Sequence, residues 1–435
     1  MKFTLRRVIG IVLTIYCIFS FYIGYLLILR NACETKQLRA AENSLNSVYA
    51  SDSDDENDSD IEVLPPQREK LYDERESLLS TLKNDKQQES APSRPLIEIW
   101  GKAAIGGYLW EHILDGSLED EEDGMRISGF QQLRNFNLRY RSGPGFIQTT
   151  VPQDIENLVL ILNGREDIKV KFAKSWLDYL PRYKKLQNVG VILLGNERCD
   201  NIWIEPYLKK NGGLIKALFI VYDSPAVDNQ RIYQWPLGVA TYRSFPKAEL
   251  TLADLETPRP FMCNFLGTVY KNSSRETLLQ IINSHDLGKY CYLKYRTTWA
   301  SQESDDSMSN YVNVLAQSDL TLNPIGFNTE CYRIYEAMSF GSLPIVEDQM
   351  TAGNCGNSST SKHAPLRLLK QMGAPIIFIK HWSELPALIK NELKLTAKQK
   401  ALRRKRIFNW YEGFKSIMRD QFLTVLDNHF FHNFS

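Results

Sequence analysis

The sequence lacks an excess of charge of either sign. It carries 52 Lys and Arg residues against 51 Asp and Glu residues, a formal net charge of +1 over 435 residues. Proteins that bind nucleic acid mainly through its phosphates need a surplus of basic residues, so we expect no nucleic-acid partner. The length and the hydrophobic content of 43% are ordinary for a globular chain of two or three domains.

Motifs for metal binding and for nucleophilic catalysis are also missing. The chain has no C-x-x-C pair, no G-x-S-x-G motif and no metal-ligand spacing among its six histidines. The Asp-x-Asp spelling by which many sugar transferases hold Mn²⁺ occurs only as Asp52-Ser-Asp54 and Asp58-Ser-Asp60. Both copies lie in an acidic tract that offers no rigid frame for ligands, so we predict no metal and no cofactor.

The sequence has few cysteines, so it can form few disulfides. The main body of the chain contains five cysteines, namely Cys199, Cys263, Cys291, Cys331 and Cys355. An odd number allows at most two intrachain bridges and one free thiol in an oxidising compartment. The sequence leaves their pairing open.

One long apolar segment stands near the N-terminus. Residues 8–29 carry no charge and, as a helix, would cross roughly 30 Å of hydrocarbon. A cleaved signal peptide is the alternative, but the segment exceeds the roughly 7–15 residues of its apolar region. We predict a signal-anchor that follows a short cytoplasmic tail at 1–7. Four glycosylation sequons follow the anchor and favour a single-pass type II protein with a lumenal body: Asn57, Asn272, Asn357 and Asn433.

Residues 30–95 do not have the composition of a folded domain. They include the run SDSDDENDSD at 51–60 and end in APSRP. Low hydrophobicity and clustered like charge cannot offset the entropy of ordering such a segment. We therefore predict a disordered acidic stem between the membrane anchor and the body.

The body reads as alternating strands and helices arranged in two halves. Short apolar runs at 96–100, 158–163, 189–195 and 217–223 predict a parallel α/β layer over 96–250. After a connector rich in proline the pattern restarts, and it predicts a second Rossmann-like domain over 251–395 with strands at 261–267, 320–324, 342–348 and 375–380. Residues 396–435 form a predicted helical tail. Two such halves place a cleft between the carboxyl ends of both sheets.

The stretch NTECYRIYEAMSFGSLPIVED at 328–348 places charges in an apolar helix. It follows the predicted strand 320–324, and Asn328 or Thr329 can cap the helix. A helix N-terminus and the fork of Arg333 suit a diphosphate, while Glu336 can accept hydrogen bonds from a ribose diol. The alternative is an Arg–Glu pair on a solvated helix face.

These residues resemble the exostosin-type glycosyltransferases and, more closely, the ribitol-5-phosphate xylosyltransferase family. The first resemblance rests on the P-x-G, R-x-x-E-A and G-x-x-P-x-V spacings between residues 324 and 346. The second rests on eight stretches that follow in order from residue 99: IWGKAAIGGYLWEHI, LILNGRE, LLGNE, YDSP, QWPLGVATYRSFP, CNFLGTVYKNSSR, NTECYRIYEA and TAGNCGN.

The resemblance implies an inverting enzyme with two Rossmann-like domains of the GT-B type. It would transfer xylose from UDP-xylose, in β-1,4 linkage, to ribitol 5-phosphate on the O-mannosyl glycan of alpha-dystroglycan. It also implies residence in the Golgi membrane and, as possible partners, other ribitol-phosphate transferases of that route. UDP-xylose is then a donor substrate and not a cofactor.

We assign candidate residues to both substrates. An inverting transfer needs positive charge at the departing diphosphate and one base for the acceptor hydroxyl. The donor-binding candidates are Gly267, Thr268, Arg275, Gly326, Asn328, Thr329, Arg333 and Glu336. The base should follow a strand of the first half, where we rank Glu166 first, ahead of Glu111 and Asp223.

The sequence is compatible with two other functions. The chain could be a non-catalytic subunit that binds a glycan or stabilises a Golgi transferase complex. It could also be a metal-dependent transferase of another fold, although the missing rigid Asp-x-Asp counts against this.

Overall fold

The computed structural model describes residues 94–120, 124–298, 304–355 and 364–432. The predicted cytoplasmic tail, the anchor at 8–29 and nearly all of the stem lie outside these ranges. Within them, no helix is both long enough and apolar enough to cross a membrane. The anchor and the stem therefore stay predictions.

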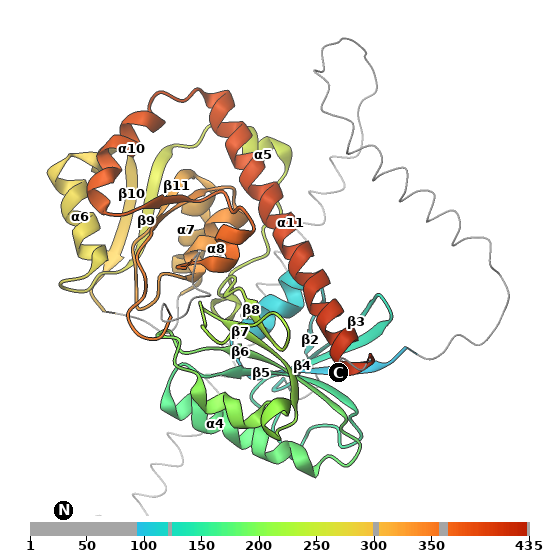
Figure 1. The fold of residues 1–435 in the computed structure, drawn as a ribbon. Coiled ribbons are helices and arrows are strands. Elements are labelled where there is room, and N and C mark those ends of the chain that lie inside the picture. The colour runs from blue at the N-terminus through green and yellow to red at the C-terminus, as the bar shows by residue number, and fades with distance from the viewer. Residues whose placement is uncertain (1–93, 121–123, 299–303, 356–363, 433–435) are drawn as a thin grey trace, which may run out of the picture. The chain divides into compact units, whose positions relative to one another are not determined.

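The first half of the body is built on an eight-stranded sheet with the order β2-β3-β4-β1-β5-β6-β7-β8 (Figure 1). The four apolar runs expected to be strands are strands. The sheet consists of β1 (Leu96–Gly101), β2 (Glu119–Asp120), β3 (Ile127–Leu133), β4 (Phe136–Ser142), β5 (Asn157–Asn163), β6 (Asn188–Leu194), β7 (Ile215–Val221) and β8 (Ile232–Trp235).

Continuous apolar runs form the central strands because both faces of this sheet are covered. Along β5, Leu158 and Leu160 face a cluster that contains Trp176 of α4 (Asp167–Tyr179). Val159 between them faces the opposite cluster, which includes residues of the C-terminal helix. Side chains alternate between the faces of a strand, so a strand buried on both sides must be apolar at every position.

The first sheet is parallel from β4 through β1 to β8, as expected, but one edge carries an antiparallel hairpin that the sequence did not predict. Strand β4 pairs parallel with β1, but β3 pairs antiparallel with β4, and β2 pairs antiparallel with β3. A tight turn at residues 134–135 joins β3 to β4, and Arg134 adopts φ 51° there. The apolar-run criterion missed this hairpin because its strands mix polar and apolar residues, as antiparallel strands with a solvated face do.

The second half is built on a five-stranded sheet in which every pairing is parallel, with the order β10-β9-β11-β12-β13. Its strands are β9 (Phe261–Thr268), β10 (Cys291–Arg296), β11 (Ser318–Asn323), β12 (Leu343–Glu347) and β13 (Ile377–Ile379). The first strand along the chain, β9, has β10 on one side and β11 on the other. The connections that leave β9 and β11 therefore diverge, which makes this pair a topological switch point.

Helices and single helical turns connect these strands. Those of the first half are α3 (Ile105–Gly107), the π-helix η1 (Tyr108–Ile113), α4, η2 (Leu180–Arg182), η3 (Ile202–Tyr207), η4 (Lys209–Asn211) and η5 (Thr241–Arg243). Those of the second half are α5 (Leu252–Glu256), α6 (Ser274–Ser284), η6 (Leu287–Lys289), α7 (Asp305–Ala316), α8 (Tyr332–Ser339), α9 (Arg367–Gln371), η8 (Trp382–Glu384) and α10 (Leu385–Glu392).

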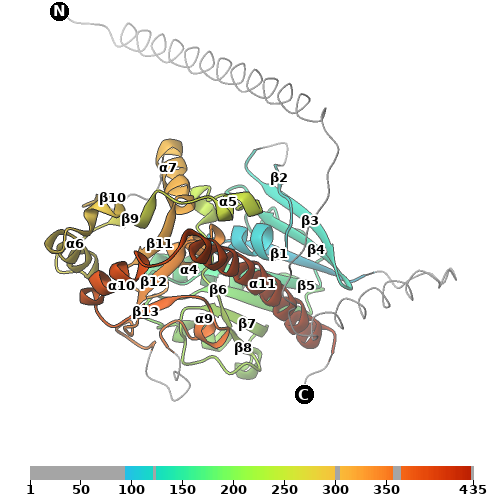
Figure 2. The same cartoon turned by 90° about the horizontal axis from the view of Figure 1, so that it is seen from above.

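A long C-terminal helix, α11 (Ala397–Phe430), contacts both halves and crosses the first sheet (Figure 2). Its N-terminus is fixed by a capping box between Thr396 and Gln399. Near its start, the buried Arg404 pairs with Asp319 of β11 at 2.8 Å. Near its end, the ring of Phe422 packs 5.5 Å from that of Phe219 in β7. The helical tail expected from the sequence thus joins the two halves.

Candidate active site

Two arginines meet at the switch point of the second sheet. Arg275 lies on α6, which follows β9, and donates from Nη1 to the carbonyl of Thr268 at 2.7 Å. Arg333 lies on α8, which follows β11, and donates from Nη2 to the carbonyl of Leu266 at 2.7 Å. Both guanidinium groups therefore lie at the carboxyl end of β9, where open α/β sheets bind their ligands.

Two glycines make room for these guanidinium groups. A Cβ on Gly267 would lie 2.8 Å from Nη2 of Arg333, and a Cβ on Gly326 would lie 2.9 Å from Nη2 of Arg275. Arg275 thus reaches from the β9 side to the loop after β11, while Arg333 reaches from the β11 side to β9. The structure thus brings together four of the predicted donor-binding residues, namely Gly267, Arg275, Gly326 and Arg333. Thr268 is a fifth, because its carbonyl accepts the hydrogen bond from Arg275.

The arginine pair has unmet bonding capacity. The Nε atoms of Arg275 and Arg333 are buried and find no acceptor in the part of the chain that the structure describes. Burial lowers the pKa of Arg275, and the like charge of the neighbouring Arg333 lowers it further. Two half-buried cations side by side are costly unless an anion joins them, and a guanidinium suits phosphate oxygens. The site therefore has the chemistry of a diphosphate site.

A buried carboxylate fixes the loops that carry these groups. Glu347, at the carboxyl end of β12, accepts a hydrogen bond from the backbone N–H of Ile325 at 3.1 Å, next to Gly326. It also accepts from the hydroxyl of Ser274, next to Arg275. The sequence analysis did not identify Glu347, although its position at a strand end is the signal that pointed to other candidates.

The structure gives Glu336 a different place from the one predicted. Its side chain is 4% exposed and does not face open space. Oε1 accepts from the backbone N–H of Ala240 at 3.1 Å, and Oε2 accepts from the hydroxyl of Tyr311 at 2.5 Å. Burial raises the pKa of this carboxyl. Glu336 therefore ties α8 to α7 and to the linker between the halves, which we define as residues 236–251 between β8 and α5, including η5. A contact with a ribose diol does not fit this geometry.

Asn328 and Thr329 do not cap α8, contrary to the prediction. The N-cap residue is Cys331, and its side chain makes no capping bond. Asn328 instead donates from Nδ2 to the carbonyl of Glu197 in the first half at 2.6 Å, and Thr329 donates to the carbonyl of Gln349 at 2.6 Å. Both side chains make hydrogen bonds that hold the loop before α8. Neither is therefore placed to bind a donor.

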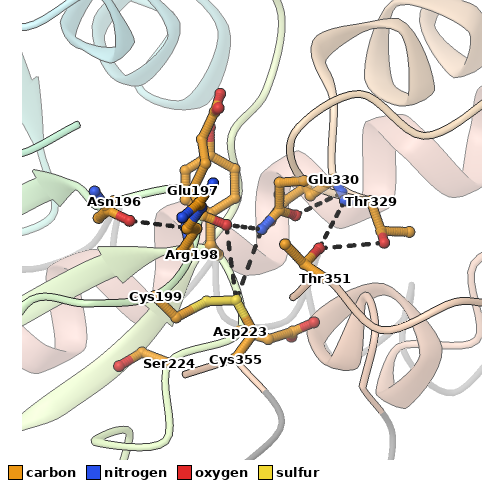
Figure 3. Close-up of a disulfide and its surroundings, with 12 residues drawn as sticks. Asn196, Glu197, Arg198, Cys199, Asp223, Ser224, Thr329, Glu330, Thr351 and Cys355 are labelled. Carbon is orange, nitrogen blue, oxygen red and sulfur yellow. Dashed lines mark hydrogen bonds between the residues drawn. A yellow bond between two sulfur atoms is a disulfide. The ribbon is translucent and has the colours of Figure 1, made fainter. Parts of the chain in front are cut away.

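A disulfide reinforces this junction. Cys199, after β6, is bonded to Cys355, and Figure 3 shows the bond beside Glu197, Thr329 and Glu330. A second disulfide joins Cys263 and Cys291, which are paired residues of neighbouring strands β9 and β10. Cys331 is the free cysteine among the five of the body. The pairing that the sequence left open is therefore one link between the halves and one within the second sheet.

The carboxyl ends of the first sheet carry a polar cluster that the sequence analysis missed. Arg165 after β5 forms an ion pair with Glu197 after β6 and donates to the hydroxyl of Tyr222 after β7 at 2.7 Å. Against the effect of burial, Tyr222, Glu197 and Tyr332 of α8 raise the pKa of Arg165. The edge of the first sheet thus faces the start of α8. The rule that strand ends carry functional residues could have identified Arg165 and Glu197.

Two of the three candidate bases lie in unsuitable surroundings. Glu166, ranked first from the sequence, is exposed at the N-cap of α4 and makes no capping bond. Asp223 accepts backbone N–H bonds from Leu366 at 2.7 Å and Arg367 at 3.0 Å, one on each carboxylate oxygen. Asp223 therefore anchors the start of α9, and the side chain of Glu166 is exposed.

Glu111 has the surroundings that a general base needs. It lies half-buried on the π-helix η1, a rare element that often marks functional sites. Burial raises the pKa of its carboxyl, and Lys247 acts in the opposite direction. Within the described residues, no hydrogen bond or ion pair engages this carboxylate. A Cβ on Gly107 would lie 3.1 Å from Oε1 of Glu111 and 2.5 Å from Oγ1 of Thr241, so these two groups share one small space.

Of the predicted glycosylation sites, the structure describes one. Asn272 is exposed, directly before the N-cap Ser273 of α6. Asn57, Asn357 and Asn433 lie outside the described residues. In the described ranges, no group of three or more His, Cys, Asp or Glu side chains is arranged to hold a metal ion.

Two α/β sheets, the second of them parallel throughout, and two half-buried arginines at its switch point give this chain the features by which open α/β proteins bind anionic ligands. The models of the RXYLT1 N-terminal domain and the RXYLT1 C-terminal domain match residues 97–236 and 242–431. The chain belongs to the RXYLT1 family.

Full-length relatives agree with this assignment. Proteins named ribitol-5-phosphate xylosyltransferase 1 are 42% identical in Homo sapiens and 41% identical in Mus musculus, each over 100% of this chain and 99% of that protein. The protein of that name in Danio rerio is 41% identical over 99% of both chains.

Solved structures are much more distant. The catalytic domain of starch synthase IV from Arabidopsis thaliana, bound to ADP and acarbose, has a TM-score of 0.38 at 9% identity over 77% of this chain and 100% of that one. An alpha1,3-fucosyltransferase has a TM-score of 0.37 at 13% identity over 80% and 95%.

The buried Glu330, next to the junction of the two halves, makes the stability of the fold depend on pH. Its buried carboxylate accepts from the backbone N–H of Leu237 at 2.9 Å and the hydroxyl of Tyr335 at 2.5 Å. Burial raises its pKa from 4.5 to about 7. The folded state then binds a proton more tightly than the unfolded state, so this group favours folding below about pH 4.5 and loses that contribution as the pH rises to about 7.

We expect Glu330→Gln, which keeps an acceptor oxygen but does not titrate, to remove this pH dependence. Urea unfolding of both proteins between pH 4.5 and 7.5 measures it. The stability difference between variant and wild type should shift by roughly 3 kcal/mol over that range, at 1.36 kcal/mol per pKa unit. Parallel stability curves for the two proteins would contradict the assignment.

Proposed function

We propose that this chain is an inverting glycosyltransferase of the GT-B type that transfers xylose from UDP-xylose to ribitol 5-phosphate on the O-mannosyl glycan of alpha-dystroglycan. The names of its full-length relatives support the xylosyl donor and the ribitol phosphate acceptor. The observation that carries the proposal is the convergence of Arg275 and Arg333 at the switch point of the second sheet.

In this reaction the bond between C1 of xylose and the diphosphate oxygen breaks, and a bond from the acceptor oxygen to C1 forms on the opposite face. The acceptor proton passes to a base, for which Glu111 is the best-placed carboxylate. Its raised pKa makes it a better proton acceptor than an ordinary glutamate. Negative charge grows on the departing diphosphate, where the two guanidinium groups stabilise it. The direct displacement needs no covalent intermediate.

The location of the enzyme is also part of this proposal. The apolar run 8–29 serves as a signal-anchor in the Golgi membrane, and the acidic stem to residue 95 holds the body in the lumen. The body divides into an acceptor-side domain at 96–250, a donor-binding domain at 251–395 and a helical tail at 396–435. The sequons and the two disulfides are consistent with an oxidising, glycosylating compartment.

The function itself is tested with the purified full-length chain. UDP-xylose and a glycan that ends in ribitol 5-phosphate are incubated with the enzyme in excess EDTA, and the product is detected by mass spectrometry. We expect transfer of one pentose without added metal. Binding of the glycan without any transfer would favour the non-catalytic subunit, and a loss restored by Mn²⁺ would favour a metal-dependent enzyme.

Arg333→Ala should abolish most of the transfer. Losing a charge-assisted contact to the developing diphosphate charge costs on the order of 2–4 kcal/mol, so kcat/KM should fall by roughly 30- to 1000-fold. Arg333→Lys should recover only part, because an ammonium cannot bind two oxygens in a fork. The exposed Arg406→Ala is the matched control. A folded Arg333→Ala variant with near wild-type turnover would disprove the donor site.

The choice of base is tested with two isosteric variants. Glu111→Gln should lower kcat by roughly 100-fold or more, because the amide cannot accept the proton, while affinity for UDP in calorimetry stays unchanged. Glu166→Gln should keep wild-type kinetics, since its side chain is exposed at the start of α4. The opposite result, with Glu166→Gln inactive and Glu111→Gln active, would restore the ranking made from the sequence.

A further inference from the structure

A pocket of about 560 Å³ opens between the linker of the two halves and helix α7. The linker wall is formed by η5 and the residues after it, and the opposite wall by one face of α7. The polar and aromatic lining residues are Tyr242, Arg243, Ser244, Asp305, Ser309 and Asn313. None of these residues is among those that form the arginine site.

The pocket lies next to residues that contact the proposed base and helix α8. Thr241 precedes the lining residue Tyr242, and its hydroxyl shares the space beside Gly107 with the carboxylate of Glu111. The ring of Tyr242 lies 5.8 Å from that of Tyr332, the residue before Arg333. Tyr242 thus connects the pocket to Thr241, which lies beside Glu111, and to Tyr332, which precedes Arg333.

Both walls of the pocket are held in place by one carboxylate. Glu336 accepts from Ala240, three residues before Arg243, and from Tyr311, which lies on α7 between Ser309 and Asn313. The pocket is therefore formed before any ligand binds. A preformed pocket loses less ordering entropy when a flexible, hydroxyl-rich ligand enters.

The lining suits a polyol that bears a single phosphate. Arg243 supplies one guanidinium, which is packed 5.3 Å from the ring of Tyr242, and its positive charge acts to lower the pKa of Tyr332 and Glu336 against the effect of their burial. Ser309, Asn313 and Asp305 provide a hydroxyl, an amide and a carboxylate, the groups that bond sugar hydroxyls. A diphosphate would call for more positive charge than this pocket has, as the paired arginines of the other site illustrate.

We propose that this pocket binds the polyol-phosphate end of the acceptor, with Arg243 on the phosphate and Tyr242 against the carbon chain. This inference rests on the proposed function, and it assigns the acceptor to the linker and α7 instead of to the first half alone.

The test compares variants that alter the pocket in two independent ways. Arg243→Ala removes the cation, and Ser309→Trp fills the pocket from an exposed position on α7. Their controls are Arg406→Ala and Ser175→Trp, exposed positions on α11 and α4. Calorimetry with ribitol 5-phosphate and with UDP is measured separately, together with KM for the acceptor.

We expect both pocket variants to weaken ribitol 5-phosphate binding and to raise the acceptor KM by tenfold or more, with UDP affinity within twofold of wild type. Arg243→Lys should lie between Arg243→Ala and wild type. An unchanged acceptor KM in both variants, with transfer intact, would overturn this proposal alone. Equal losses of UDP affinity would also overturn it, since the pocket would then serve the donor. If the wild-type chain binds ribitol 5-phosphate, loses this binding in the pocket variants and transfers no xylose, the pocket assignment would be supported and the proposed function refuted.

Discussion

The carboxylate of Glu336 links its own helix to two other parts of the structure, and the candidate site depends on it. It belongs to α8, the helix that carries Arg333, and it accepts from Ala240 in the linker and from Tyr311 in α7. Removing it would leave a buried N–H and a buried hydroxyl unsatisfied, at a cost of about 1–3 kcal/mol for each. A charge inside an apolar helix is thus explained by the tertiary contacts that it satisfies.

Other buried acidic side chains also accept backbone N–H bonds along the junction of the two halves. Glu330 accepts from Leu237, and Asp223 accepts from the backbone at the start of α9. The disulfide between Cys199 and Cys355 adds a covalent link near them. Acidic side chains of one half that bond backbone N–H groups of the other fix orientation as well as distance. A site shared between two domains can therefore be preorganised without a ligand.

The sequence predicted the parts of the fold that rest on local pattern. All eight apolar runs became strands, because buried parallel strands must be apolar throughout. It also singled out Arg275 and Arg333, because residues after strand ends meet at one edge of a sheet. It could not predict the partners of Glu336, Asn328 or Asp223, since each partner lies in a distant segment that only the folded chain brings near. The hairpin of β3 and β4 was missed because solvated strands mix polar and apolar residues.

The most direct test of this account is a structure of the protein with UDP bound, at a resolution that places the phosphates. The account predicts that the diphosphate lies within hydrogen-bond distance of both Arg275 and Arg333 and meets their buried Nε atoms, while Glu336 keeps its bonds to Ala240 and Tyr311. A diphosphate remote from both arginines, or a ribose bound to a Glu336 that has released Ala240, would contradict it.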